Sequence, residues 1–146
     1  KKYQVYFFTS KTYIPLHFAR HSWVVTVEDK KINRFEVWYT ELSDAEHFGH
    51  VHKNINPPTV GLKKLKAANT QHWDSTLAGH ITGDENSTAE RMVDFINMNS
   101  SLYKYKEEYV LFPGPNSNTY IQWILNEFPE VDITLPWNCF GKKYLS

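Results

Sequence analysis

The chain has 146 residues, and 16 lysines and arginines balance 16 aspartates and glutamates. That length fits one domain with a sizeable core, so we expect a single domain over residues 1–146. The zero net charge argues against a nucleic-acid partner. The single cysteine excludes an intrachain disulfide and a multi-cysteine zinc site. No apolar run approaches the roughly 20 residues that span a bilayer, and the start at Lys1 leaves open a targeting segment removed before it.

Aromatic residues make up 16% of the chain, which favours pleated, half-buried surfaces and a sheet-rich core. Residues 3–8 are expected to form the first strand, followed by a turn-rich connection over 15–20. Residues 21–27 and 35–39 are β-branched and aromatic, and they predict a hairpin across the polar turn 28–31. Residues 41–58 predict a long loop or an edge strand, in which Val51 suggests an extended piece.

The second half of the chain predicts two helices. Residues 61–83 hold a lysine-rich surface segment and then an apolar patch that favours a further strand. Ser87 to Glu90 is a capping box, and the stripe that follows it predicts a helix ending near Asn99. Residues 103–112 predict an extended segment, 117–128 the second helix, and 129–146 an irregular or strand-bearing tail. The expected fold is α+β, with an antiparallel aromatic-rich sheet packed with two main helices.

The turn before the second helix, residues 111–120, is the most informative segment. Pro113 and Pro115 fix their own φ angles, so the chain must turn sharply before Asn116. Ser117 lies four residues before Ile121 on the apolar face, so its side chain is expected to point inward. There it would feel the positive end of the helix dipole and lie beside unpaired backbone N–H groups, which can stabilise an oxyanion. The competing interpretation is an ordinary helix cap, because Asn, Ser and Thr are favoured caps.

The predicted hairpin places a histidine near a carboxylate. If it turns tightly at residues 29–30, residues whose numbers sum to 59 face one another, which pairs His21 with Trp38 and Trp23 with Glu36. Glu36 then lies diagonal to His21, near enough to orient the imidazole. The alternatives are a satisfied strand histidine and a surface carboxylate.

A histidine on an early strand and a nucleophile at a late helix start occur in this order in circularly permuted papain-like proteins. The segment 116–120, Asn-Ser-Asn-Thr-Tyr, resembles the nucleophile motif of that superfamily with serine in place of cysteine. The superfamily includes NlpC-type peptidases, lecithin–retinol acyltransferase-like enzymes and a permuted group of deubiquitinating peptidases. The resemblance implies a permuted papain-like layout.

A closer resemblance covers most of the chain. The segments 21–23, 35–38 and 113–119, with Leu135-Pro136 and Gly141-Lys142, resemble an uncharacterised bacterial domain family of unknown function. The serine is typical of that family, whose members supply no activity to transfer.

The serine changes the chemistry expected of the site, because a hydroxyl needs a general base where a thiol ionises readily. Ser117, His21 and Glu36 form either a working acyl-transfer triad of nucleophile, base and orienter or the relic of one. The residues expected to bind a ligand around it are Asn116, Asn118, Trp23 and Trp38, with the backbone N–H of Ser117 or Asn118 as oxyanion donor.

A rival constellation is the histidine-rich segment 47–52. His47, His50 and His52 are weak candidates for a zinc or copper site, because no standard metal-binding spacing is present. Cys139 has no helix-start context and is expected to be a small buried hydrophobe.

Three functional hypotheses follow. The first is a hydrolase or acyltransferase acting on an amide or ester of a small molecule or peptide, without a cofactor. The second is a non-catalytic ligand- or peptide-binding domain that keeps the cleft. The third is metal binding by the histidine segment. The oligomeric state stays open.

Overall fold

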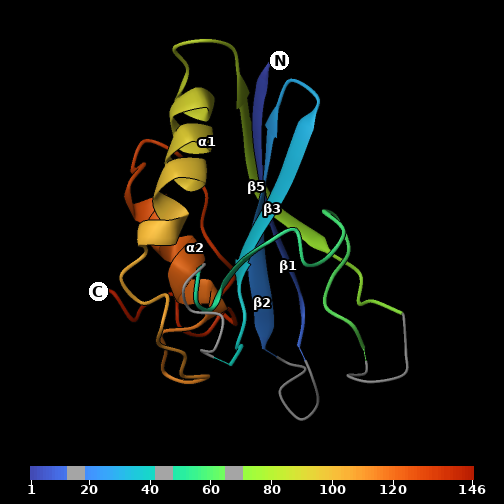
Figure 1. Ribbon diagram of the computed structural model, residues 1–146, viewed down its shortest axis with the longest axis vertical. Helices are drawn as coiled ribbons and strands as arrows, with labels where there is room; N and C mark the ends of the chain where they lie inside the picture. Colours follow the sequence, from blue (N-terminus) through green and yellow to red (C-terminus); the bar gives the residue numbers. More distant parts are fainter. Residues whose placement is uncertain (13–18, 42–47, 65–70) are drawn as a thin grey trace.

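The computed structural model describes residues 1–12, 19–41, 48–64 and 71–146 (Figure 1). Five strands form one antiparallel sheet in the order β4-β3-β2-β1-β5. The strands are β1 (Tyr3–Lys11), β2 (Arg20–Glu28), β3 (Lys31–Val37), β4 (Val51–Lys53) and β5 (Thr76–Gly83). The helices are α1 (Thr88–Asn99), a short 3₁₀ turn η2 (Ser100–Leu102) and α2 (Ser117–Asn126). This confirms the α+β class with an antiparallel sheet and two main helices.

Both helices cover the same face of the sheet, as Figure 1 shows, with α1 packed on β1 and β5 and α2 on β2 and β3. Alternate strand residues such as Phe7, Val24 and Phe35 face the helices and form the main core with Val93 and Ile121. The intervening residues point to the other face. Among the described residues, no helix is long and apolar enough to cross a membrane.

The central hairpin has the predicted register. Val24 pairs with Phe35 and Glu28 with Lys31, so facing residue numbers sum to 59. Asp29 takes the left-handed conformation with φ 55°, which suits a tight turn. The β3 strand begins at Lys31 and ends at Val37, so Trp38 and Tyr39 lie beyond the strand in which we expected them.

Other expected elements differ in their limits. The extended piece at Val51 is an edge strand, β4, and the further strand expected within residues 61–83 is β5. Residues 103–112 were expected to be extended, and this was wrong for 104–107: Lys106 N–H donates to Tyr103 O and Glu108 N–H to Tyr105 O, so these residues form turns, whereas 108–110 have no regular structure. At the start of this segment the Tyr103 ring packs against Tyr120 of α2. The tail after residue 129 forms turns and no strand.

Candidate functional site

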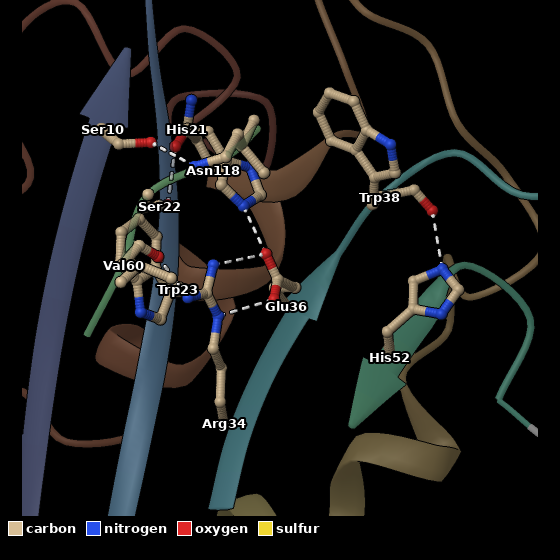
Figure 2. A network of polar contacts seen from close by, with 12 residues as sticks. Ser10, His21, Ser22, Trp23, Arg34, Glu36, Trp38, His52, Val60 and Asn118 are labelled. Carbon is tan, nitrogen blue, oxygen red and sulfur yellow. Dashed lines mark hydrogen bonds and ion pairs between the residues drawn. The ribbon is translucent and has the colours of Figure 1, made fainter. Parts of the chain in front are cut away.

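A buried polar network lies on the sheet face opposite the helices (Figure 2). Its centre is Glu36 on β3. One carboxylate oxygen, Oε1, is 2.7 Å from His21 Nε2, and the other, Oε2, is 2.7 Å from Arg34 Nε. Arg34 Nη2 also donates to Oε1 at 3.0 Å, so the arginine grips the carboxylate with two donors. None of the three side chains has exposed surface.

The charges and hydrogen bonds of the network determine which ring nitrogen of His21 carries its proton. Burial would raise the pKa of Glu36, but the hydrogen bonds that His21 and Arg34 donate to it and the charge of Arg34 outweigh burial and lower that pKa. Burial lowers the pKa of His21, and the attraction of Glu36 only partly opposes this. The imidazole is therefore neutral at neutral pH. Because an ionised carboxylate only accepts, Nε2 carries the proton and Nδ1 carries the lone pair.

The remaining ring nitrogen, His21 Nδ1, is buried and has no hydrogen-bond partner among the described residues. A buried acceptor without a partner is costly, so such an atom calls for an explanation. A histidine with one nitrogen held by a carboxylate and the other free has the arrangement of a general base.

Arg34 was missed by the sequence reasoning. Its guanidinium lies 4.0 Å from the centre of the Trp23 ring, and its Nη1 donates to the backbone oxygens of Pro57 and Val60. Trp23 donates to Pro58 O, so the segment 57–60 closes this face of the sheet. The sequence did contain an indication of this role, because Arg34 precedes Glu36 by two residues and residues at that spacing in a strand lie on the same face.

The start of α2 is capped by Asn116 and not by Ser117. Asn116 Oδ1 accepts from the backbone N–H groups of Asn118 and Thr119, and Thr119 Oγ1 accepts from Asn116 N–H. This reciprocal box satisfies the N–H groups of Asn116, Asn118 and Thr119. Ser117 is the first residue of the helix and 5% exposed, as the spacing predicted. Its hydroxyl makes no hydrogen bond in the described part of the chain, so capping does not account for it.

Of the two backbone N–H groups expected to bind an oxyanion, those of Ser117 and Asn118, one is already engaged. The Asn118 N–H is already bonded to Asn116 Oδ1 at 2.9 Å. The backbone N–H of Ser117 has no partner within the helix, because it belongs to the first turn. Ser117 N–H is therefore the donor that the first turn of α2 can offer.

Asn118 fastens the start of α2 to β2. Its Nδ2 donates to Arg20 O at 2.8 Å and to Phe140 O at 2.9 Å, and its Oδ1 accepts from Ser22 Oγ at 2.6 Å. Arg20 and Ser22 are the two neighbours of His21. These bonds occupy both amide protons, so the side chain holds the helix, and its predicted role in binding a ligand stays a prediction.

Asn118 contacts β2 at a point where β2 is no longer paired with β3. The described pairing of β2 with β3 runs from Val24 to Glu28. At Arg20 the edge of β2 that faces away from β1 is taken instead by Asn118 and by Asn138, whose oxygen accepts from Arg20 N–H at 3.0 Å. The α2 start therefore lies beside β2 at the level of His21. No hydrogen bond joins the Ser117 hydroxyl to His21 in the structure.

Trp38 covers the histidine. Its ring meets the His21 ring edge-on at 5.5 Å between centroids, which agrees with the facing positions expected from the register. Trp38 is half-buried, whereas Trp23 is fully buried and stacked on His21 at 5.9 Å. The structure thus brings together His21, Glu36, Trp23 and Trp38, as the hairpin predicted.

The histidine segment gives no support for a metal site. His47 lies outside the described residues. His50 Nδ1 accepts from Thr40 N–H at 3.0 Å, and His52 Nε2 lies 3.2 Å from Trp38 O, so one nitrogen of each ring is already engaged. No group of three or more metal-ligating side chains occurs in the parts of the chain that the structure describes.

Cys139 is fully buried, and burial raises the pKa of its thiol to about 12. A thiol that stays protonated is a poor nucleophile. It is a small hydrophobe of the core, as expected.

Comparison with known proteins identifies the family to which the chain belongs. No curated protein and no solved structure matches the chain. A family described as "Protein of unknown function (DUF3750)" matches residues 2–144, which is nearly the whole chain. The chain therefore belongs to the DUF3750 family.

Proposed function

We propose that this protein is a hydrolase or acyltransferase that acts on an amide or ester, with Ser117 as nucleophile, His21 as general base and Glu36 as the residue that orients the base. Its site would have the layout of the permuted papain-like proteins, with serine replacing cysteine. The substrate is a small molecule or a peptide, and the reaction requires no cofactor.

The observation that carries the proposal is the 2.7 Å contact between His21 Nε2 and Glu36 Oε1, which leaves Nδ1 without a partner. A carboxylate that holds one ring nitrogen fixes the tautomer and stabilises the imidazolium formed during catalysis. Arg34 keeps that carboxylate ionised. The unpartnered lone pair is then the place to which a proton can move.

The position of Ser117 supports the same roles. Its neighbour Asn118 is bonded to the residues on both sides of His21, so the start of α2 lies beside β2 at the level of that histidine. Catalytic hydrogen bonds are commonly long in unliganded sites and tighten when substrate binds. The proposal therefore requires Oγ and Nδ1 to approach to hydrogen-bond distance in the complex.

The reaction proceeds in two steps. Ser117 Oγ attacks the carbonyl carbon while its proton passes to His21 Nδ1, and the Ser117 N–H binds the developing oxyanion. The C–N or C–O bond then breaks, and the imidazolium returns its proton to the leaving amine or alcohol. Water or an acceptor nucleophile releases the acyl group from the serine, again with His21 as the base.

A serine-directed fluorophosphonate probe tests this proposal. The wild-type protein and a Ser101→Ala control should be labelled, Ser117→Ala should not, and His21→Gln should be labelled at least about 100-fold more slowly. The Ser117 hydroxyl makes no described hydrogen bond, so its loss should change the free energy of unfolding by no more than about 0.5 kcal/mol. Equal labelling of the wild type and Ser117→Ala would remove the nucleophile.

One observation favours a second candidate, a non-catalytic domain that binds a small molecule or peptide. The side chains of His21 and Glu36 have no exposed surface. A base sealed from solvent fits a relic of a catalytic site that now only stabilises the fold. Ligands that raise the melting temperature and are recovered unaltered after incubation, together with no labelling of Ser117, would establish this candidate.

A further inference from the structure

A surface hollow of about 360 Å³ lies next to the start of α2. Its aromatic lining residues are Phe112, Trp137, Phe140 and Tyr144. The Phe112 and Trp137 rings each meet Phe140 edge-on at 6.0 Å between centroids. Phe112 is 71% exposed and Trp137 is 76% exposed. Aromatic rings gathered around a hollow and left open to solvent are typical of a binding surface.

The hollow is joined to the candidate site by the segment 139–141. Phe140 O accepts from Asn118 Nδ2 and Gly141 O accepts from Thr119 Oγ1 at 2.8 Å. Gly141 lies so close to Asn116 that an added Cβ would meet its Oδ1 at 2.2 Å. The backbone that forms the wall of the hollow therefore clamps the residues on both sides of Ser117.

The charged residues that line the hollow are positive. Lys142 and Lys143 are its charged lining residues, and none of the acidic residues that the structure describes lines it. Lys142 Nζ donates to Leu135 O at 2.7 Å, which holds this ammonium in place and leaves two of its protons for another acceptor. Neither lysine forms a salt bridge within the described residues. Such a surface complements an anion.

From this combination we propose that the hollow binds an aromatic carboxylate. The inference rests on the proposed function and names its substrate class: an amide or ester whose acyl group carries an aromatic ring. The ring lies among Phe112, Trp137 and Phe140. Cleavage by water turns the acyl group into a carboxylate, and the lysines attract that product.

Calorimetric titration with phenylpropionate tests the proposal, because it measures binding without requiring turnover. Ser117→Ala protein is used so that binding is separated from chemistry. Trp137→Ala and Phe112→Ala should each weaken binding by about tenfold, whereas Tyr39→Ala, an exposed aromatic residue outside the hollow, should not. Neutral phenylpropionamide should bind more weakly than phenylpropionate, and Lys143→Gln should reduce that difference while Lys31→Gln should not.

Unchanged affinity in both aromatic variants, equal binding of the acid and the amide, or no saturable binding would overturn the inference. These outcomes differ from a failure of the proposed function. Binding that depends on Trp137, combined with unimpaired probe labelling of Ser117→Ala, would remove the nucleophile and keep the binding site. Labelling that depends on Ser117, without binding of phenylpropionate, would keep the nucleophile and remove this substrate class.

Discussion

Charged side chains are exposed at one end of the sheet and buried at the other. At one end, where β1 starts and α1 begins, Lys1 pairs with Asp84 and Lys2 with Glu85 at 3.5 Å, and all four side chains are at least 35% exposed. At the other end, where β2 starts, His21 and the Arg34–Glu36 pair have no exposed surface. Exposed pairs contribute little to stability, whereas a buried pair must be fully satisfied to be tolerated.

The two helix starts repeat this difference. Ser87 caps α1 at the surface, and Glu90 reaches back to Asn86 N–H, one residue earlier than a strict capping box requires. Asn116 caps α2 in a buried position, and Asn118 links that turn to residues nearly a hundred positions away. Capping thus has only a local role at the start of α1, whereas at the start of α2 it is part of a candidate site. The start of α2 differs in having buried polar residues beyond those that a cap needs.

The largest effect should come from breaking the buried ion pair. Glu36→Gln removes the negative charge and leaves the Arg34 guanidinium buried without its counter-charge. We expect a loss of about 3 to 5 kcal/mol in the free energy of unfolding, measured by urea denaturation. Glu85→Gln at the exposed end should have no measurable effect. Equal effects of the two substitutions would show that the two ends do not differ energetically.

A smaller effect is expected at the start of α2. Asn118→Ala leaves the partners Arg20 O, Phe140 O and Ser22 Oγ without their hydrogen bonds, which should lower the free energy of unfolding by about 2 to 3 kcal/mol. Ser87→Ala removes an ordinary cap and should lower it by about 1 kcal/mol. Urea denaturation of both variants compares the two starts directly. If Ser87→Ala were the more damaging change, Asn118 would not be the anchor of α2.

The smallest effect is a dependence of stability on pH. Burial lowers the pKa of folded His21, so below its ordinary pKa the unfolded chain binds more protons, and stability falls as the pH drops. From about pH 7 to about pH 5.5 we expect a loss of about 1 kcal/mol from this histidine. Below the ordinary pKa of Glu36, protonation of the unfolded chain adds a further loss.

His50 has to be separated from His21 in this measurement, because burial and the charge of His52 lower its pKa in the same direction. Urea denaturation at several pH values should give a shallower decline for His21→Gln and for His50→Gln, and the shallowest for the double variant. A wild-type slope retained in His21→Gln would mean that His21 does not lose its proton on folding.

Short-range patterns were sufficient to predict much of this fold. Alternation along the strands and the tight turn at Asp29 gave the register, and the register placed Glu36 beside His21. Polar caps before apolar stripes located the starts of both helices. The permuted papain-like layout and the catalytic roles stay predictions, since neither the geometry nor the family tests them.

The parts that could not be predicted depend on contacts between distant segments. Nothing near Pro57 in the sequence indicates that residues 57–60 close over Arg34. The segment 103–112 has the aromatic content of a strand, but its Tyr103 ring packs against Tyr120 and Trp123 on α2. The clamp of Phe140 and Gly141 on α2 likewise joins irregular backbone to a helix, for which sequence offers no periodic signal.

The span of the Asn118 contacts has a consequence for biosynthesis. One bond reaches back 98 positions to Arg20 and another reaches forward 22 positions to Phe140. Loop closure over such separations is slow compared with the formation of a helix or a hairpin. While the ribosome still holds the segment around Phe140, the nascent polypeptide lacks one of the three anchors of its candidate site. Any activity that this site has would therefore arise only after the segment around Phe140 has been translated and has left the ribosome.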